Sequence, residues 1–218
     1  MAVVLDHLVV AARSLDEGVA WCEATLGVTP GPGGRHALMG THNRLVNLSS
    51  DTFPNSYLEV IAIDPDAPPP GRTRWYDLDD AALQAALTEG PQLIHWVVRS
   101  SNLKADLQTL LAAGWDGGDA IHVERGELRW QISVRPDGRR LCDGVLPTLI
   151  EWGAKHPCDD MPASELRLQS LTVEGMPGSA MSALQPVGIN HEPKLSTVRL
   201  KAILSAPNGW TELTSRPF

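Results

Sequence analysis

The sequence predicts an α+β fold with two βαβββ modules, which form a curved mixed sheet around a cleft, and a partial third βαββ unit at the C-terminus. Three observations predict it. A strand, helix, strands order of hydrophobic patterns occurs twice, and a proline-rich segment separates the two copies. Each copy also has a histidine in its first strand, His7 and His95, at nearly the same distance before the glycine that ends the following helix.

We expect the first module to span residues 1–64. Leu5–Ala11 (LDHLVVA) is a short β-rich run. Ser14 and Glu17 then have the spacing of a capping box, so a helix is expected to begin there and to end at Gly27, which suits a left-handed C-terminal cap. Three short strands are expected to follow, near His36–Leu38, Arg44–Leu48 and Tyr57–Ile63.

Residues 65–90 are expected to be a linker and a helix. The stretch Asp64–Arg72 (DPDAPPPGR) holds prolines that cannot occupy a central strand. A helix around Leu78–Leu87 is expected to pack on the outside of the sheet.

The second module is expected at residues 91–158. It begins with the strand Leu93–Val98, and Ser100 or Ser101 would cap a helix that ends at Gly114. Further strands are expected near Ile121–Glu124, Leu128–Val134 and Leu146–Trp152. Residues 159–218 resemble a weakened third unit that packs on the others, with a strand at Leu166–Val173, a helix at Ser179–Leu184, and a hairpin formed by Val198–Leu204 and Trp210–Leu213.

Composition excludes several classes of protein. The chain has 18 Lys and Arg against 26 Asp and Glu, a net charge of −8 without a basic cluster, which argues against a nucleic-acid partner. No apolar run approaches the ~20 residues of a membrane-spanning helix. The beginning of the sequence lacks a secretory signal, and the three cysteines lack CxxC spacing. We therefore expect a cytoplasmic protein with a small-molecule ligand.

Four ionisable residues interrupt strands that are otherwise apolar: His7, Glu59, His95 and Glu151. Each module has a histidine on its first strand and a glutamate on its last. An unpaired buried carboxylate costs several kcal/mol, so exposure, a hydrogen bond, a salt bridge or a metal must offset the cost. If the modules face one another, two imidazoles and two carboxylates meet. Such a set suits zinc, nickel, iron(II), cobalt or manganese.

The sequence resembles the vicinal oxygen chelate superfamily in LDHLVVAARSLDEGVAWCEATLGV, YLEVIAID, LIHWVV and TLIEWG. More narrowly, LDHLVV, GGRHALMGTHNRLVNL, YLEVIAID, and EWG followed by His156 and Pro157 are similar to the glyoxalase-like domain proteins. The resemblance implies that His7, Glu59, His95 and Glu151 match the metal ligands of glyoxalase I in order. It also implies that His7, His95 and Glu151 could supply the two histidines and one glutamate of an extradiol dioxygenase.

A glycine-rich segment, residues 31–44, is expected to form a hairpin at the mouth of the cleft. Its polar residues either satisfy turn hydrogen bonds or orient a carboxylate or carbonyl of the substrate. The candidates for substrate binding are Arg35, His42, Asn43 and Arg44.

Trp96 and Trp152 adjoin candidate ligands. By alternation we expect these tryptophans to point to the opposite face of the sheet and to anchor outer helices.

Three functions fit these patterns. The first is a metal-dependent lyase or isomerase that stabilises an enediolate-like intermediate, with Glu151 or Glu59 as the base that moves the α-proton. The second is a metal-free protein that binds or sequesters a small molecule, and the third is an extradiol-type dioxygenase. Because both modules lie in one chain, the cleft does not require a second subunit, although a homodimer is compatible with the sequence.

Overall fold

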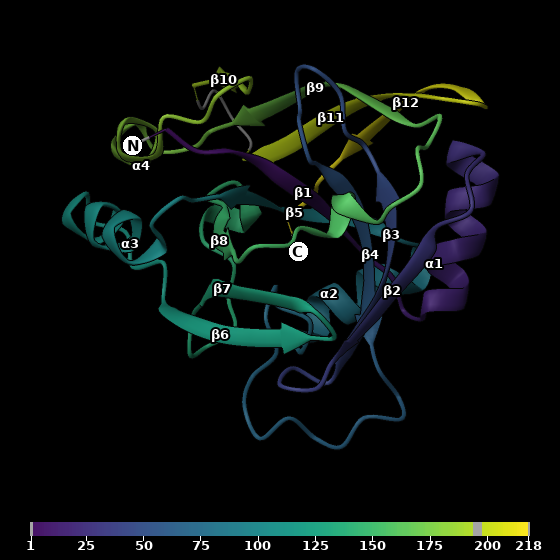
Figure 1. The fold of residues 1–218 in the computed structure, drawn as a ribbon, viewed down its shortest axis with the longest axis horizontal. Helices are drawn as coiled ribbons and strands as arrows, with labels where there is room; N and C mark the ends of the chain where they lie inside the picture. The colour runs from purple at the N-terminus through teal and green to yellow at the C-terminus, as the bar shows by residue number, and fades with distance from the viewer. Residues whose placement is uncertain (1, 194–197, 218) are drawn as a thin grey trace.

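The computed structural model describes residues 2–193 and 198–217 (Figure 1). Within them the chain forms a large curled sheet and a smaller sheet that lies above it in the view of Figure 1. The strands are β1 (Val4–Ala11), β2 (Gly31–His36), β3 (Thr41–Asn47), β4 (Tyr57–Ile63), β5 (Gln92–Arg99), β6 (Asp119–Arg125), β7 (Leu128–Val134), β8 (Thr148–Trp152), β9 (Arg167–Glu174), β10 (Asn190–Glu192), β11 (Arg199–Ala206) and β12 (Gly209–Thr214). The helices are α1 (Leu15–Trp21), α2 (Ala81–Ala86), α3 (Leu103–Ala112) and α4 (Gly178–Leu184).

The large sheet has the strand order β2-β3-β4-β1-β5-β8-β7-β6. Antiparallel pairing of β1 with β5 joins its two halves, and the parallel pairs β1–β4 and β5–β8 make it a mixed sheet. The sheet curls until its edge strands approach one another: a Cβ built on Gly34 of β2 would lie 2.4 Å from Cδ of Arg125 at the end of β6. The predicted α+β class with a curved mixed sheet is confirmed.

Local sequence signals set most of the helix ends. Oγ of Ser14 accepts a hydrogen bond of 3.2 Å from the backbone N–H of Glu17, and the helical segment that continues α1 ends at Gly27, whose φ is 69°. For α3, the N-cap differs from the prediction. Oδ1 of Asn102 accepts from the N–H of Ala105, and Ser100 instead accepts from the N–H of Asn102.

One expected strand lies elsewhere. The strand expected near His36–Leu38 is found at Gly31–His36, in a segment with three glycines and one proline. This segment can be a strand because β2 is at the edge of the sheet, where Pro32 interrupts no central ladder.

The hydrophobic core has two layers. The outer core lies between the large sheet, the helices α1, α3 and α4, and the smaller sheet β10-β9-β11-β12. The inner core fills the inside of the curled sheet. It combines sheet residues such as Val9 and Ile61 with Trp75, Tyr76 and Leu83 from the segment between the two halves.

The sequence suggested that the linker helix packs on the outside of the sheet. The structure places it on the inside instead. Helix α2 and the residues before it occupy the inside of the curl (Figure 1). The physical reason is that the inner face of the sheet is apolar, and other residues must pack against it to bury it from water. Burial of Leu78, Leu83 and Leu87, each at most 1% exposed, supplies this cover, at a gain of about 25 cal/mol per Å².

A bulge in β1 changes the expected side-chain alternation. The register against β5 shifts between Leu5 and His7, so Asp6 is an extra residue in the strand. Leu5 packs in the outer core, whereas Asp6 and His7 both contact groups on the inner side. The bulge thus places two adjacent ionisable side chains in the same interior.

Candidate functional site

A buried pair, His7 and Glu59, lies at the centre of the inner side. Nε2 of His7 is 3.6 Å from Oε2 of Glu59, and the two side chains are 4% and 6% exposed. Nδ2 of Asn43 donates a hydrogen bond of 2.6 Å to Oε1 of the same glutamate. The ring of Tyr57 stacks on the imidazole with a centroid distance of 4.5 Å. Strands β1, β3 and β4 position these residues. The shared face of Tyr57 and Glu59 on β4 was predictable from sequence, whereas the bulge in β1 separates His7 from the face of Leu5.

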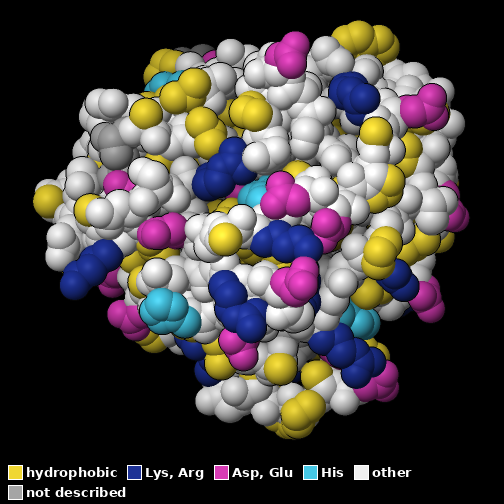
Figure 2. All heavy atoms as spheres, in the orientation of Figure 1, with side chains coloured by type: hydrophobic (Ala, Val, Ile, Leu, Met, Phe, Trp, Pro, Cys, Tyr) yellow, Lys and Arg dark blue, Asp and Glu magenta, His cyan; other side chains and the backbone are white. Residues whose placement is uncertain are grey.

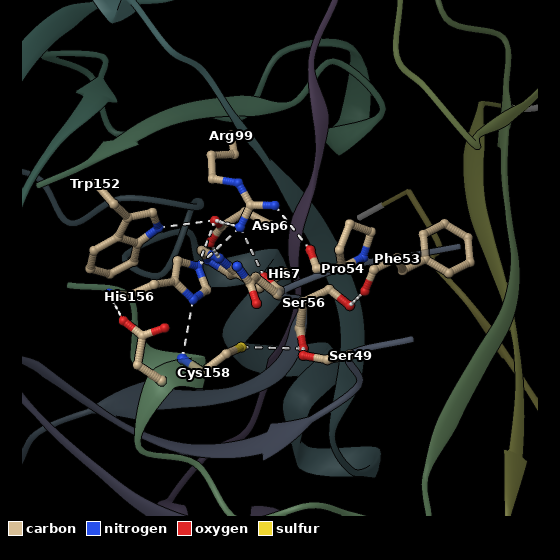
Figure 3. Close-up of polar contacts among 12 residues, drawn as sticks. Asp6, His7, Ser49, Phe53, Pro54, Ser56, Arg99, Trp152, His156 and Cys158 are labelled. Carbon is tan, nitrogen blue, oxygen red and sulfur yellow. Dashed lines mark hydrogen bonds and ion pairs between the residues drawn. The ribbon is translucent and has the colours of Figure 1, made fainter. Parts of the chain in front are cut away.

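Asp6 fixes the other side of His7. Its carboxylate accepts hydrogen bonds from Nδ1 of His7 at 2.7 Å, Nε2 of His156 at 3.1 Å and Nε1 of Trp152 at 2.9 Å (Figure 3). Arg99 lies 3.7 Å away. Burial by itself would raise the pKa of Asp6, but the hydrogen bonds from His156 and His7 outweigh it and hold the pKa well below its usual range.

Sequence reasoning missed Asp6 and gave Trp152 the wrong face. Strict alternation directs the residue before His7 to the outer face, and only the bulge reverses this. Trp152 contacts Asp6 and packs against the inner core, so it does not anchor an outer helix. Trp96 does face the outer core, as expected.

The polar network continues from Glu59 towards β6. Asn43 lies 3.4 Å from Nε2 of His36, and Nη1 of Arg125 lies 3.2 Å from the same nitrogen and 3.3 Å from Oδ1 of Asn43. Burial, and then the charge of Arg125, lower the pKa of His36 to about 3. His36 is therefore neutral at physiological pH, and Arg125 faces uncharged partners.

His95 lies on the inner side of the sheet, but both of its ring nitrogens contact nearby residues. Its Nδ1 is 3.0 Å from the carbonyl oxygen of Gly144, while Nε2 accepts from the backbone N–H of Thr148 at 3.2 Å and lies 3.0 Å from its Oγ1. Burial, followed by the charge of Arg140, lowers the pKa of His95 to about 3. Both ring nitrogens of this neutral histidine are thus engaged within the protein.

Glu151 lies on the outer face of the sheet. Its Oε2 accepts a hydrogen bond of 2.7 Å from the N–H of Leu103, the first residue of α3, where a carboxylate complements the helix dipole. Leu149 and Glu151 do share a face, but that face belongs to the outer core. The structure does not bring Glu151 to His7, Glu59 and His95.

The four predicted ligands, as placed, do not fit one metal ion. Only the His7 and Glu59 side chains lie near each other, His95 has no free ring nitrogen, and Glu151 is across the sheet. In the described part of the chain, no group of three or more His, Cys, Asp or Glu residues has the geometry to hold an ion.

The predicted substrate-binding residues divide between the two faces. Asn43 is buried beside Glu59. Arg35, His42 and Arg44 border a shallow cavity of about 290 Å³ on the other side of β2 and β3. There Nε of Arg35 lies 3.2 Å from the buried carboxylate of Asp64, and Nδ1 of His42 lies 3.9 Å from it.

A larger cavity, which the sequence did not reveal, lies where β2 and β3 face the β6–β7 turn. Its volume is about 580 Å³. We call it the edge pocket, and it is lined by residues 27–29, 31–33, 45–47, 125, 127, 128, 155, 157 and 160–165. Leu45 and Arg125 connect it to the polar network, because Leu45 is the cross-strand neighbour of Glu59 and Arg125 contacts Asn43. In Figure 2, acidic and basic side chains mix across the middle of the face shown.

In the residues that the structure describes, no helix has the length and apolar character needed to cross a membrane.

Comparison with known proteins places the chain in a family. No curated protein matches it. Among solved structures, a hypothetical protein from Staphylococcus aureus is similar over 99% of this chain and 87% of its own, with a TM-score of 0.59 and 14% identity, which shows a common fold alone. A variant methylmalonyl-CoA epimerase of Streptomyces coelicolor, in complex with 2-nitronate-propionyl-CoA, has a TM-score of 0.45 and 20% identity over 70% of this chain and 96% of its own. The epimerase from Mycobacterium tuberculosis has a TM-score of 0.39 and 17% identity over 72% of this chain and 91% of its own.

The profile of the glyoxalase-like domain matches residues 5–187, which is most of the chain. The resemblance found in the sequence is therefore confirmed, and the protein belongs to the glyoxalase-like domain family.

Proposed function

We propose that this protein binds a small molecule in the edge pocket, without a metal ion at the four positions that the sequence singled out. The observation that carries the proposal is the pocket itself: at about 580 Å³ it has the volume of a typical small-molecule site. Its lining joins apolar side chains, such as Val28, Leu128 and Met161, to a few polar groups.

The metal-dependent lyase, isomerase or dioxygenase expected from the sequence needs a shared ion. Members of the superfamily commonly use divalent metals. In this chain, the donors that would form the site are separated or already bonded, so these residues as placed do not fit such an ion.

A second candidate, favoured by the contact between His7 and Glu59, is proton transfer in a lyase or isomerase. Glu59 is the one of the two predicted base residues that lies on the inner side. It would take an α-proton from a small oxygenated substrate and return it to the rearranged product. Because Asn43 bonds Glu59 and lies between it and Arg125 of the pocket wall, the substrate must displace the Asn43 amide to react.

A steric variant tests the binding function. Met161→Trp adds bulk to the wall of the edge pocket, and Leu111→Trp adds the same side chain at an exposed site on α3. A library of small acids, amides and alcohols is screened by thermal shift against both variants and the parent protein. We expect compounds that stabilise the parent and Leu111→Trp but not Met161→Trp. If every stabilising compound acts equally on all three proteins, the pocket is not the binding site.

The second candidate is tested separately. Glu59→Gln should abolish exchange of the α-proton of a bound compound with solvent deuterium, measured by NMR, while binding in the edge pocket persists. Exchange at the parental rate in Glu59→Gln would remove Glu59 as the base.

A further inference from the structure

We infer that the ligand of the edge pocket is an apolar carboxylate and that Arg125 binds its carboxylate group. This inference rests on the proposed function, since it names the ligand class of the same pocket.

Arg125 is a half-buried cation among neutral groups. Its Nη1 contacts Nε2 of His36 and Oδ1 of Asn43, and its guanidinium carbon is 5.9 Å from the centre of the Trp130 ring. Within residues 2–193 and 198–217, no carboxylate lies within salt-bridge distance of Arg125. A partly desolvated charge without a counter-charge favours an anionic ligand.

The second cation of the pocket is already neutralised. Nζ of Lys155 lies 2.7 Å from Glu127 and 2.6 Å from Asp160, two acids that also line the pocket. Glu165, the remaining acid of the lining, is exposed, so water and salt screen its charge. Two cations and three acids therefore line the pocket, and among the described residues Arg125 is the cation of the lining that has no acid within salt-bridge distance. At Arg125 itself, a single guanidinium suits a monoanion.

The side chain of Arg125 is held in place before any ligand binds. Its stem lies against the backbone of Gly34, where an added Cβ would come within 2.4 Å of Cδ. Asn43 is held in turn by the N–H of Gly34, which donates to its Oδ1 at 2.8 Å. All the hydrogen bonds that the described residues make with Arg125 involve Nη1, so the donors of Nη2 remain for a carboxylate oxygen.

The rest of the lining sets the character of the ligand body. Val28, Leu45, Leu128 and Met161 present hydrocarbon to the cavity. An apolar chain or ring gains free energy by leaving water for such a surface, whereas an inorganic anion gains only the charge interaction. The combination selects a molecule with one carboxylate and an apolar body.

The test compares two probes of the same shape. Binding of 4-phenylbutyrate and of the neutral 4-phenylbutanamide is measured by isothermal titration calorimetry for the parent protein, Arg125→Gln and Arg125→Lys, with inorganic phosphate as a third probe. Arg129→Gln is the matched control, because Arg129 lies just beyond the same turn, pairs with Glu124 and does not line the pocket. We expect the parent and Arg129→Gln to bind the acid at least tenfold more tightly than the amide. Arg125→Gln should bind both equally, and phosphate should bind more weakly than the acid.

The outcomes separate this inference from the proposed function. Equal affinity of the parent for acid and amide, an unchanged preference in Arg125→Gln, or phosphate binding as tight as that of the acid overturns the carboxylate assignment and leaves the pocket as a binding site. Absence of binding by both organic probes at about 10 mM overturns the assignment, and the Met161→Trp screen then decides on the pocket. If circular dichroism shows Arg125→Gln to be unfolded, the preference for the acid must fall as salt rises in the parent protein, and a salt-independent preference overturns the inference.

Discussion

Asn43 donates a hydrogen bond of 2.6 Å to the buried carboxylate of Glu59. This bond joins the centre of the inner side to the wall of the edge pocket, because Oδ1 of the same amide accepts from Arg125. Replacement of Asn43 therefore affects both regions.

We predict that Asn43→Leu lowers the free energy of unfolding by about 1–3 kcal/mol, since it removes the amide donor of a buried carboxylate. Urea denaturation at neutral pH measures the change. The control is Arg44→Leu at the neighbouring exposed position, for which we expect a change within about 0.5 kcal/mol. Equal stability of the two variants would show that the bond to Glu59 contributes nothing.

A second prediction concerns the helix inside the curl. Leu83 of α2 is fully buried in the inner core, so Leu83→Ala should cost about 2–5 kcal/mol. Leu111 of α3 is 60% exposed, and Leu111→Ala should change the free energy of unfolding by less than about 0.5 kcal/mol. Thermal unfolding of both variants checks the assignment. A small effect of Leu83→Ala would place α2 on the surface.

Much of the architecture follows from local patterns, and the exceptions have physical causes. The strand at Tyr57–Ile63 and the helix that begins after Ser14 were predictable because alternation and a side-chain cap are properties of a few neighbouring residues. The inner position of α2 was not, because it depends on which apolar surface of the assembled sheet lacks a cover. The edge pocket also depends on the tertiary fold, since it joins strands far apart in the chain.

In the candidate site, too, some features follow from local sequence patterns and others depend on the tertiary fold. Alternation predicts that Glu59 shares a face with Tyr57 and Ile61, and the structure shows that this face is the inner one. Glu151 could not be assigned to the outer side from sequence, because alternation says which residues share a face but not which face of the sheet is inside. The role of Asp6 required knowledge of the bulge, which has no glycine or proline to announce it.

A third prediction addresses metal binding through Glu151. Glu151→Gln weakens the cap of α3 and should lower the free energy of unfolding by about 1 kcal/mol. Because Glu151 and His95 are engaged elsewhere, we expect Glu151→Gln and His95→Ala to contain the same amount of zinc, nickel, iron, cobalt and manganese as the parent protein purified without chelator. Elemental analysis by mass spectrometry makes the comparison. If both variants contain one equivalent of metal less than the parent protein, the hypothesis of a four-residue metal site would be supported again.

The last prediction uses the acid dependence of stability. The folded-state pKa of Asp6 is depressed below its ordinary value of 3.8, so its ionised form stabilises the fold above pH 3.8, and this contribution is lost as the pH falls towards the lower folded-state value. Asp6→Asn removes a buried charge with several partners and should cost about 3–5 kcal/mol at neutral pH. The difference in unfolding free energy between the parent and Asp6→Asn, measured in urea, should shrink below about pH 4.

Asp80→Asn is the control, since asparagine still caps α2 in place of an exposed aspartate. The unfolding free energy of Asp80→Asn should stay close to that of the parent protein at every pH. A difference for Asp6→Asn that is constant from pH 7 to pH 3 would mean that the Asp6 carboxylate is not selectively stabilised in its ionised form by His7 and His156.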